Sequence, residues 1–290
     1  MLLALITTEK AMTEVLENRI DELNPFEDSY IEHELAFYDN MKDWTGKKAK
    51  INIVGGKFMR VDDFFNTNMR QTVKVPCLHV ANPIPALQGK WELAMSLSHM
   101  EMQSSWLPIL EADGVCATAG LGLGYYALRV IAKEEVEKLW IFERNEDVVQ
   151  AFEDRFTDRE GYDKCEFIVG SAREHFQGYD VDHCFMDIYH TMMPDELIDD
   201  TRLFLSKNNI GVYHPWCLER IVLDAVNQGV MSANFIPWNM RSLFRMWTET
   251  EIDEDGTTMD QMYEYGAEPD YCENVITALA DGGQHWAEIK

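Results

Sequence analysis

Three glycines alternate directly after a short apolar run and form the most distinctive cluster in the sequence. The apolar run covers residues 115–119, and Gly120, Gly122 and Gly124 follow it. Glycines at the end of a strand let the backbone approach a ligand, and they open a helix whose first N–H groups face that ligand. A tight turn without a ligand is the alternative, but three alternating glycines exceed what a turn needs. The pattern therefore favours a nucleotide-like ligand.

A second candidate is Glu143, which ends the apolar run 139–142 and follows Gly124 by 19 residues. An acidic residue about 20 positions after such a loop commonly accepts the hydroxyl groups of a ribose. The competing interpretation is a solvated charge at a strand end. If Glu143 faces a ligand pocket, we expect its removal to weaken ligand binding and barely change folding stability.

The elements that must position these residues alternate between strand and helix. Apolar runs predict five strands, at residues 115–119, 139–142, 166–169, 183–186 and 209–213. Helical spacing of apolar residues separates them, with Asn145 expected as a helix cap and Pro194 in the first turn of a later helix. This alternation predicts a Rossmann-like, doubly wound α/β sheet with both faces covered. Ligands bind at the carboxyl ends of such strands, so Ser171 and Asp187 are further candidates.

The N-terminal part of the chain follows a different pattern. Residues 8–23 read as a helix that Asn24 and Pro25 end, and residues 50–89 read as short antiparallel strands around a Gly-Gly pair. Residues 91–110 read as a helix that is apolar on several faces and therefore buried. We expect a smaller N-terminal α+β region over residues 1–110 and the Rossmann-like domain over residues 111–290.

Four segments resemble, in order and spacing, the successive motifs of class I S-adenosylmethionine-dependent methyltransferases. They are residues 118–127, 140–145, 167–173 and 185–189. Within that superfamily the spermidine synthase-like branch is similar too, because a small β region and a helix reading like residues 98–102 precede the glycine loop there.

The resemblance implies S-adenosylmethionine as the cofactor and a role for each matching position. Gly120, Gly122 and Gly124 would wrap the methionine and ribose part, and Glu143 would hold the ribose diol. Ser171 and Ala172 would lie beside the adenine, Tyr125 would form a pocket wall, and Asp187 would face the transferred group. Thr118 and Ser171 stand where the family has acidic residues, and a hydroxyl cannot supply the stronger charge-assisted hydrogen bond.

Several functions remain open on these residues. The first is methyl transfer to a small molecule, with Asp187 orienting or deprotonating the acceptor. Aminopropyl transfer, as in spermidine synthases, is a second, although the sequence around Asp187 offers no second nearby acid. A nicotinamide enzyme is a third, because residues 122–127 fit G-x-G-x-x-A. A binding protein that has lost catalysis on the same scaffold is the fourth.

Composition limits the partners. The 290 residues include 25 Lys and Arg against 51 Asp and Glu, a formal net charge of −26. Such a surface repels nucleic acids and anionic lipids, so cationic or neutral small molecules are the expected partners, and a homodimer is left open. Six scattered cysteines without a Cys-x-x-Cys pair favour free thiols and a cytoplasmic chain, and no apolar run is long enough to span a membrane.

No metal site is expected. His183, Asp187 and His190 are near one another in the sequence, but the alternation of a strand points His183 away from its neighbours. His214 and Cys217 form an isolated pair, short of the four ligands of a structural zinc site. Residues 251–256 imitate a calcium loop but lack its final glutamate, so they read as an acidic surface loop.

Overall fold

The computed structural model describes residues 24–27, 30, 34–35, 43–45, 51–61, 71–81, 91–251, 267–284 and 286. The helix predicted over residues 8–23 and most of the acidic loop that begins at Glu251 lie outside the described residues.

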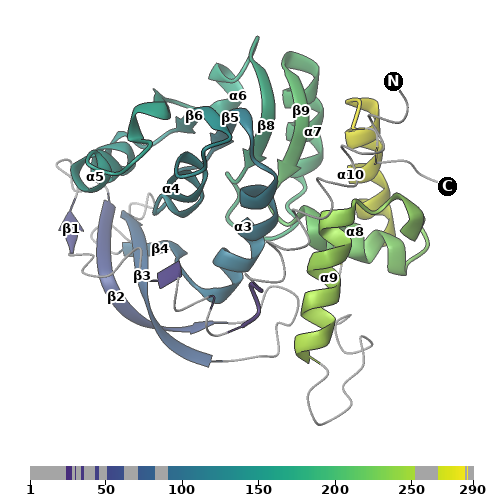
Figure 1. Ribbon diagram of the computed structural model, residues 1–290, viewed down its shortest axis with the longest axis horizontal. Coiled ribbons are helices and arrows are strands. Elements are labelled where there is room, and N and C mark those ends of the chain that lie inside the picture. The colour runs from purple at the N-terminus through teal and green to yellow at the C-terminus, as the bar shows by residue number, and fades with distance from the viewer. Residues whose placement is uncertain are drawn as a thin grey trace.

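The centre of the molecule is a five-stranded parallel sheet (Figure 1). Its strands are β5 (Gly114–Ala119), β6 (Val136–Glu143), β7 (Cys165–Val169), β8 (Asp180–Met186) and β9 (Asn209–Pro215). The spatial order is β7-β6-β5-β8-β9, and all four strand pairs are parallel. This is the doubly wound order, in which the strand order reverses beside the first strand. The predicted Rossmann-like sheet is therefore confirmed.

The helices predicted after the glycine loop, after Asn145, near Pro194 and over residues 218–226 are present, together with three that were not predicted, α6, α9 and α10. They are α4 (Tyr125–Ile131), α5 (Glu146–Phe156), α6 (Ala172–His175), α7 (Glu196–Lys207), α8 (Leu218–Asn227), α9 (Trp238–Glu251) and α10 (Pro269–Asp281). Short 3-10 turns lie at Tyr162–Lys164 and Ala233–Phe235. The Asn145 side chain accepts a hydrogen bond from the Asp147 amide, which confirms it as the cap of α5. Pro194 lies just before the cap residue of α7 instead of in its first turn.

The N-terminal region forms a four-stranded antiparallel sheet. Its strands are β1 (Trp44–Thr45), β2 (Ile51–Val61), β3 (Gln71–Ala81) and β4 (Trp91–Ser96). The predicted antiparallel element is confirmed, but the Gly-Gly pair is not at a turn. It lies inside β2, where the register with β3 shifts between Val54 and Lys57. Glycine pairs suit such an irregularity because they adopt backbone angles that other residues avoid.

The helix predicted over residues 91–110 is wrong in its first third. Residues 91–96 pair with β3 as strand β4, and the helix α3 spans only His99–Glu111. A short apolar run suits a strand as well as a helix, and hydrogen bonding to the open edge of β3 decides between them here. Helix α3 itself is buried along most of its length, as expected.

One hydrophobic core connects the two sheets. Ile51 and Leu78 of the small sheet belong to the same cluster as Leu107 of α3 and Cys116 of β5. In Figure 1, β2 and β3 form a curved layer below α4, and α9 and α10 lie on the other side of the molecule. The division at residue 110 stays a prediction.

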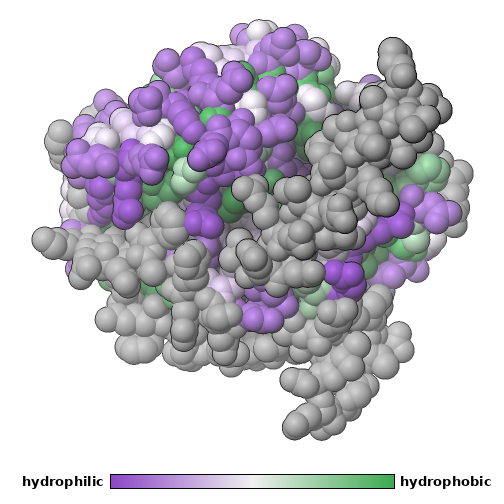
Figure 2. All heavy atoms as spheres, in the orientation of Figure 1, coloured by the Kyte–Doolittle hydropathy of each residue, from purple (hydrophilic) through white to green (hydrophobic). Residues whose placement is uncertain are grey.

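The described part of the surface is mainly hydrophilic. Figure 2 shows mainly hydrophilic side chains on the described part of one face, with apolar residues gathered in smaller areas between them. All six cysteines are free, as predicted. None of the described helices is both long and apolar enough to cross a bilayer.

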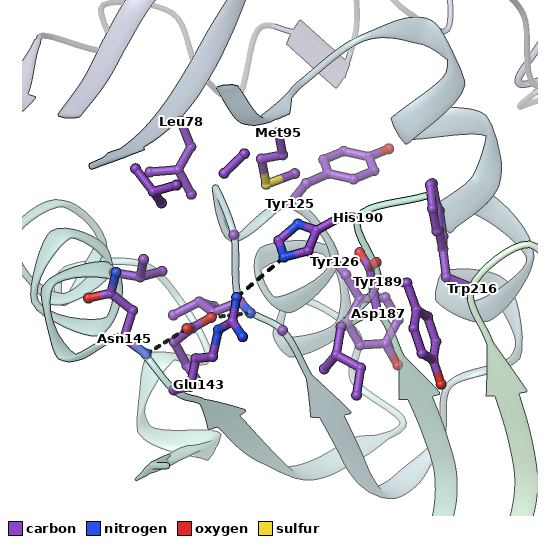
Figure 3. A pocket seen from close by; sticks show the side chains of 18 of the residues that line it. Leu78, Met95, Tyr125, Tyr126, Glu143, Asn145, Asp187, Tyr189, His190 and Trp216 are labelled. Atoms are coloured by element: carbon purple, nitrogen blue, oxygen red, sulfur yellow. Dashed lines mark hydrogen bonds between the residues drawn. The ribbon is translucent and has the colours of Figure 1, made fainter. Parts of the chain in front are cut away.

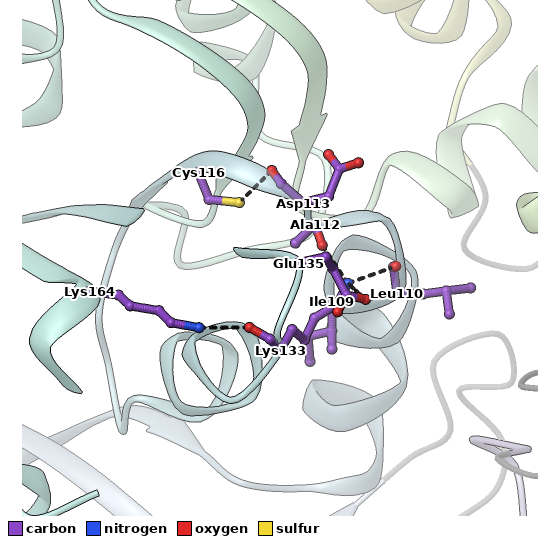
Figure 4. Close-up of polar contacts among 8 residues, drawn as sticks. All are labelled: Ile109, Leu110, Ala112, Asp113, Cys116, Lys133, Glu135 and Lys164. Carbon is purple, nitrogen blue, oxygen red and sulfur yellow. Dashed lines mark hydrogen bonds and ion pairs between the residues drawn. The ribbon is translucent and has the colours of Figure 1, made fainter. Parts of the chain in front are cut away.

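Lys133 fixes the C-terminal end of α3 (Figure 4). Its ammonium group donates hydrogen bonds to the carbonyl oxygens of Ile109 at 2.9 Å, Leu110 at 3.0 Å and Ala112. The last carbonyl groups of a helix have no partner within the helix, so a cation that binds several of them stabilises this end. The Lys164 ammonium group in turn donates to the carbonyl oxygen of Lys133 at 2.7 Å.

We expect Lys133→Met to lower the free energy of unfolding by about 2–4 kcal/mol, because charged hydrogen bonds contribute about 1.5–3 kcal/mol each and the carbonyl groups recover part of this from water. Urea denaturation measures the change. Lys207→Met, at an exposed lysine, is the matched control and should stay within about 0.5 kcal/mol of the wild type. A loss below that level in Lys133→Met would show that the ammonium group does not hold α3.

Candidate functional site

A cavity of about 910 Å³ lies between the small sheet, α3 and the carboxyl edge of the parallel sheet (Figure 3). Its volume is in the range of pockets that hold cofactors and other small molecules. The wall consists of residues from β3, β4 and α3 on one side and from the glycine loop and the ends of β6, β7 and β8 on the other. The ligand edge predicted from the sequence therefore lines a partly open cavity.

The glycine loop takes a backbone conformation that glycine alone adopts easily. Gly120 has a φ of 89° and Gly122 a φ of 52°. A Cβ atom on Gly120 would overlap the carbonyl oxygen of Asp187, and one on Gly122 would overlap the sulfur of Met95. The glycines are thus required by packing within the protein, apart from any role in ligand binding.

Strand β4 covers part of this loop. The sulfur of Met95 accepts a hydrogen bond from the Leu123 amide at 3.0 Å. Met95 also lines the cavity, and Figure 3 shows it above the glycine loop. The small N-terminal sheet therefore completes the site.

Glu143 ties the glycine loop to the start of α5. One carboxylate oxygen accepts from the Leu121 amide at 3.0 Å, and the other accepts from the Asn145 amide at 2.8 Å. The side chain is only 8% exposed. Burial raises the pKa of Glu143, while the backbone hydrogen bonds and Arg144 act to lower it. These two hydrogen bonds indicate a structural role for Glu143, whereas the sequence alone led us to expect that its removal would barely change folding stability.

Asp187 follows β8 and lines the cavity close to the glycine loop. Its amide donates to the carbonyl oxygen of Ala119 at 2.9 Å, which joins the ends of β8 and β5. Burial and the negative charge of Glu143 raise the pKa of Asp187 from 3.8 to about 7. A carboxyl group with a pKa near neutrality suits proton transfer at physiological pH.

The structure adds an acid that sequence reasoning missed. Glu101 of α3 lines the same cavity, and burial together with the charge of Asp187 raises its pKa well above the ordinary value. The two carboxyl groups lie 86 residues apart in the chain, so only the packing of α3 over the sheet edge brings them together. Glu101 belongs to the segment 98–102, whose resemblance to spermidine synthases concerned only its place before the glycine loop, so the sequence did not assign Glu101 to the site.

The remaining predicted residues divide into two groups. Ser171, Ala172 and Tyr125 line the cavity. The hydroxyl of Tyr125 donates away from it, to the carboxylate of Glu34, and lies 3.2 Å from the hydroxyl of Tyr30.

Thr118 and Gly124 do not line the cavity. The Thr118 hydroxyl is buried in the sheet, and among the described residues it has no hydrogen-bond partner. Gly124 lies at the start of α4 with a φ of 83°, where a Cβ atom would meet the ring of Phe152 at 2.5 Å. Neither residue therefore contributes to the cavity wall.

Two further side chains stand at the cavity mouth. Nη2 of Arg144 lies 3.3 Å from Nε2 of His190, a contact that joins the ends of β6 and β8 (Figure 3). His190 is exposed, whereas His183 is fully buried inside β8. Asp187 and His190 line the cavity, and His183 does not.

Comparisons with known proteins show a similarity of fold, and they do not identify a substrate or a function. No protein-family model matches the sequence, and no curated protein matches it. The O-methyltransferase TomG from Streptomyces achromogenes, solved with S-adenosylmethionine, is 14% identical over 51% of this chain and 66% of its own, with a TM-score of 0.32. Spermidine synthase from Thermotoga maritima is 11% identical over 53% of this chain and 63% of its own, with a TM-score of 0.30.

Precorrin 8W decarboxylase from Methanobacterium thermoautotrophicum is 19% identical over 38% of this chain and 57% of its own, with a TM-score of 0.31. The chain thus spans less than two thirds of the length of each of these three proteins. The sheet order establishes the doubly wound fold by itself. The chain is similar in structure, at low sequence identity, to S-adenosylmethionine-dependent methyltransferases and to spermidine synthase.

Proposed function

We propose that this protein binds an S-adenosyl ligand in the cavity and transfers a group from it to a small molecule that carries an amine. The observation that supports the amine is the pair of carboxyl groups on Glu101 and Asp187. Each is half-buried at the cavity wall, and the charge of Asp187 together with desolvation raises the pKa of Glu101. A cationic group placed between them would relieve this repulsion, since opposite charges attract strongly in a poorly hydrated site.

The residues around the glycine loop fit the adenosyl part of the ligand. A carboxylate has about four acceptor positions, and the backbone amides of Leu121, Asn145 and Gly122 act on that of Glu143, so the remaining capacity would serve a ribose hydroxyl group. Ser171 and Ala172 line the cavity beside the end of β7, where the adenine would lie. Thr118 is buried behind the loop and offers no contact, so the binding role that the resemblance implied for it is not part of the proposal.

The reaction needs alignment and one proton transfer. The sulfonium group of S-adenosylmethionine supplies an activated methyl carbon. The protein holds the acceptor in line with this carbon, which is the main source of rate acceleration in such a transfer. Asp187 accepts the proton that an ammonium group must lose before its nitrogen can attack. The N–C bond then forms as the S–C bond breaks, and the neutral thioether leaves.

Aminopropyl transfer is the second candidate, and a specific observation favours it. The sequence around Asp187 offered no second acid for a polyamine, and Glu101 supplies one. Isothermal titration separates the ligands: S-adenosylmethionine and S-adenosylhomocysteine should bind best for methyl transfer, and methylthioadenosine for aminopropyl transfer. Tight binding without turnover on any amine would favour the binding-protein alternative, and tight binding of NAD alone would remove the adenosyl proposal.

The variant Glu101→Gln tests the amine site. We expect KM for a diamine acceptor such as putrescine to rise at least tenfold, because a desolvated charge pair contributes more than the 1.4 kcal/mol that corresponds to a decade. The dissociation constant for S-adenosylhomocysteine should stay within about twofold. Glu174→Gln, at an exposed glutamate, is the matched control. An unchanged KM in Glu101→Gln would show that Glu101 does not contact the acceptor.

A further inference from the structure

Three side chains of metal-binding types converge on one face of the parallel sheet, away from the residues of the proposed reaction. They are Glu111 at the end of α3, His183 of β8 and His214 of β9. One ligand atom of each lies within 4.8 Å of the others. Nδ1 of His214 lies 3.8 Å from Oε2 of Glu111. Two ligands across a tetrahedral zinc ion are roughly 3.4 Å apart when the bonds are about 2.0–2.1 Å, so small side-chain movements suffice.

Each of the three side chains is oriented by a second contact through its other polar atom. Nδ1 of His183 lies 3.3 Å from the hydroxyl of Tyr126. Nε2 of His214 lies 3.2 Å from a carboxylate oxygen of Glu219. The amide of Asn239 donates to Oε1 of Glu111 at 3.2 Å. Contacts of this kind are typical of metal sites, where they fix the histidine tautomer and the direction of each ligand.

The contacts leave one atom of each side chain free to face the centre of the cluster. Nε2 of His183 is fully buried and has no hydrogen-bond partner among the described residues. A buried, unpartnered imidazole nitrogen is costly unless something binds its lone pair.

Two carboxylates lie beside one histidine of the cluster, because Glu111 and Glu219 both contact His214. The positive charge of Lys133 also acts on the cluster, at His183. A proton on His214, held between the two carboxylates, is the competing occupant of this position.

We propose that Glu111, His183 and His214 hold a divalent transition-metal ion, with zinc as the best match. Two imidazole nitrogens and one carboxylate oxygen suit zinc and its neighbours in the first transition row. Magnesium and calcium prefer sets made wholly of oxygen ligands. The site has one solvent side, since the Glu111 side chain is 18% exposed and the histidines are almost fully buried.

An ion at this position would hold together elements that form the cavity. Its ligands come from α3, β8 and β9, and the first two of these elements also carry Glu101 and lead to Asp187. A bound ion would fix the distance between the helix and the strand that form the cavity. The sequence could not show this cluster, because Glu111 and His214 are 103 residues apart, and His214 read as the partner of Cys217.

The test uses the full chain without an affinity tag, stripped of metal by a chelator and then titrated with zinc or cobalt(II). We expect one equivalent to bind, with a raised melting temperature, and the cobalt form to show visible d–d absorption from a site with nitrogen ligands. Excess magnesium should not displace the ion, whereas weak binding at the acidic surface would be displaced.

The variants assign the site. Glu111→Gln and His214→Gln should abolish stoichiometric binding, and His175→Gln, at an exposed histidine, should retain it. Asn239→Ala keeps all three ligands and should weaken zinc binding about 10–100-fold, which keeps the test valid if a ligand variant does not fold. Circular dichroism without metal checks folding. A wild-type chain that binds no equivalent of either ion, or binding that survives both ligand variants, would overturn the proposal and leave the cluster as a protonated ion pair.

Discussion

Asp187→Asn is expected to lower the rate of group transfer by about 10²–10⁴-fold, the range typical of losing a general base. The asparagine keeps the backbone that joins β8 to β5, so the dissociation constant for S-adenosylhomocysteine should change little. Release of S-adenosylhomocysteine with a panel of amine acceptors measures the rate, and calorimetric titration measures the affinity. Equal losses in rate and affinity would mean that the change distorts the glycine loop instead of removing a base.

The pH dependence supplies a second readout for Asp187. A base must be deprotonated to act, and burial together with the charge of Glu143 raises the pKa of Asp187 to about 7. The rate constant kcat/KM should therefore fall as the pH drops below about 7 and level off above it. A flat profile across this range would exclude Asp187 as the base.

Folding stability should depend on pH in the opposite sense to the rate, falling as the pH rises. Because the pKa of Asp187 is higher in the folded chain than in the unfolded chain, the folded state holds the proton more tightly between about pH 4 and pH 7. Stability from this carboxyl group is fully present below that window and is lost as the pH rises through it. Asp187→Asn should thus be more stable than the wild type at pH 8, with the difference shrinking toward pH 4.

Glu143→Ala is expected to weaken adenosyl-ligand binding at least tenfold and also to lower the free energy of unfolding by about 2–4 kcal/mol. Hydrogen bonds to a charged group contribute about 1.5–3 kcal/mol each, and the alanine leaves the amides of Leu121 and Asn145 without their partner. Calorimetric titration with S-adenosylhomocysteine and urea denaturation measure the two effects.

Glu143→Gln separates binding from folding. The glutamine keeps one acceptor oxygen, so it can satisfy one of the two amides and should lose about half of the stability that alanine loses. If the ribose hydroxyls bind this side chain, affinity should still fall, because a neutral amide is the weaker acceptor. Loss of stability with unchanged affinity in both variants would reduce Glu143 to a structural role.

The sequence predicted the parallel sheet well because each strand is a continuous apolar run that a glycine or a polar residue ends. Such strands are buried on both faces, as the neighbouring residues Ile141 and Phe142 of β6 are, and few other structures accommodate them. Strand β4 escaped prediction because its apolar residues fit two periods, and an edge provided by β3 decided the outcome.

The candidate site was predicted where local sequence determines position. Glu143, Ser171 and Asp187 follow strands directly, so the end of each strand places them at the cavity. Glu101 and the structural role of Glu143 depend on contacts between distant segments, which no local pattern records. Thr118 lies inside its strand, as predicted, but the sheet buries its side chain, so it does not reach the cavity as the resemblance implied.

The packing of Gly120 against the backbone of Asp187 has a consequence for anyone who re-engineers this protein. The glycine loop would hold the adenosyl ligand, and the end of β8 would act on the acceptor. These two segments are in direct contact, and there is no room for a methyl group between them. A library that varies Gly120 therefore also displaces residue 187, and selection for a new ligand would alter turnover in the same step. The glycine loop and the end of β8 must therefore be transferred to another protein, or varied in a library, together.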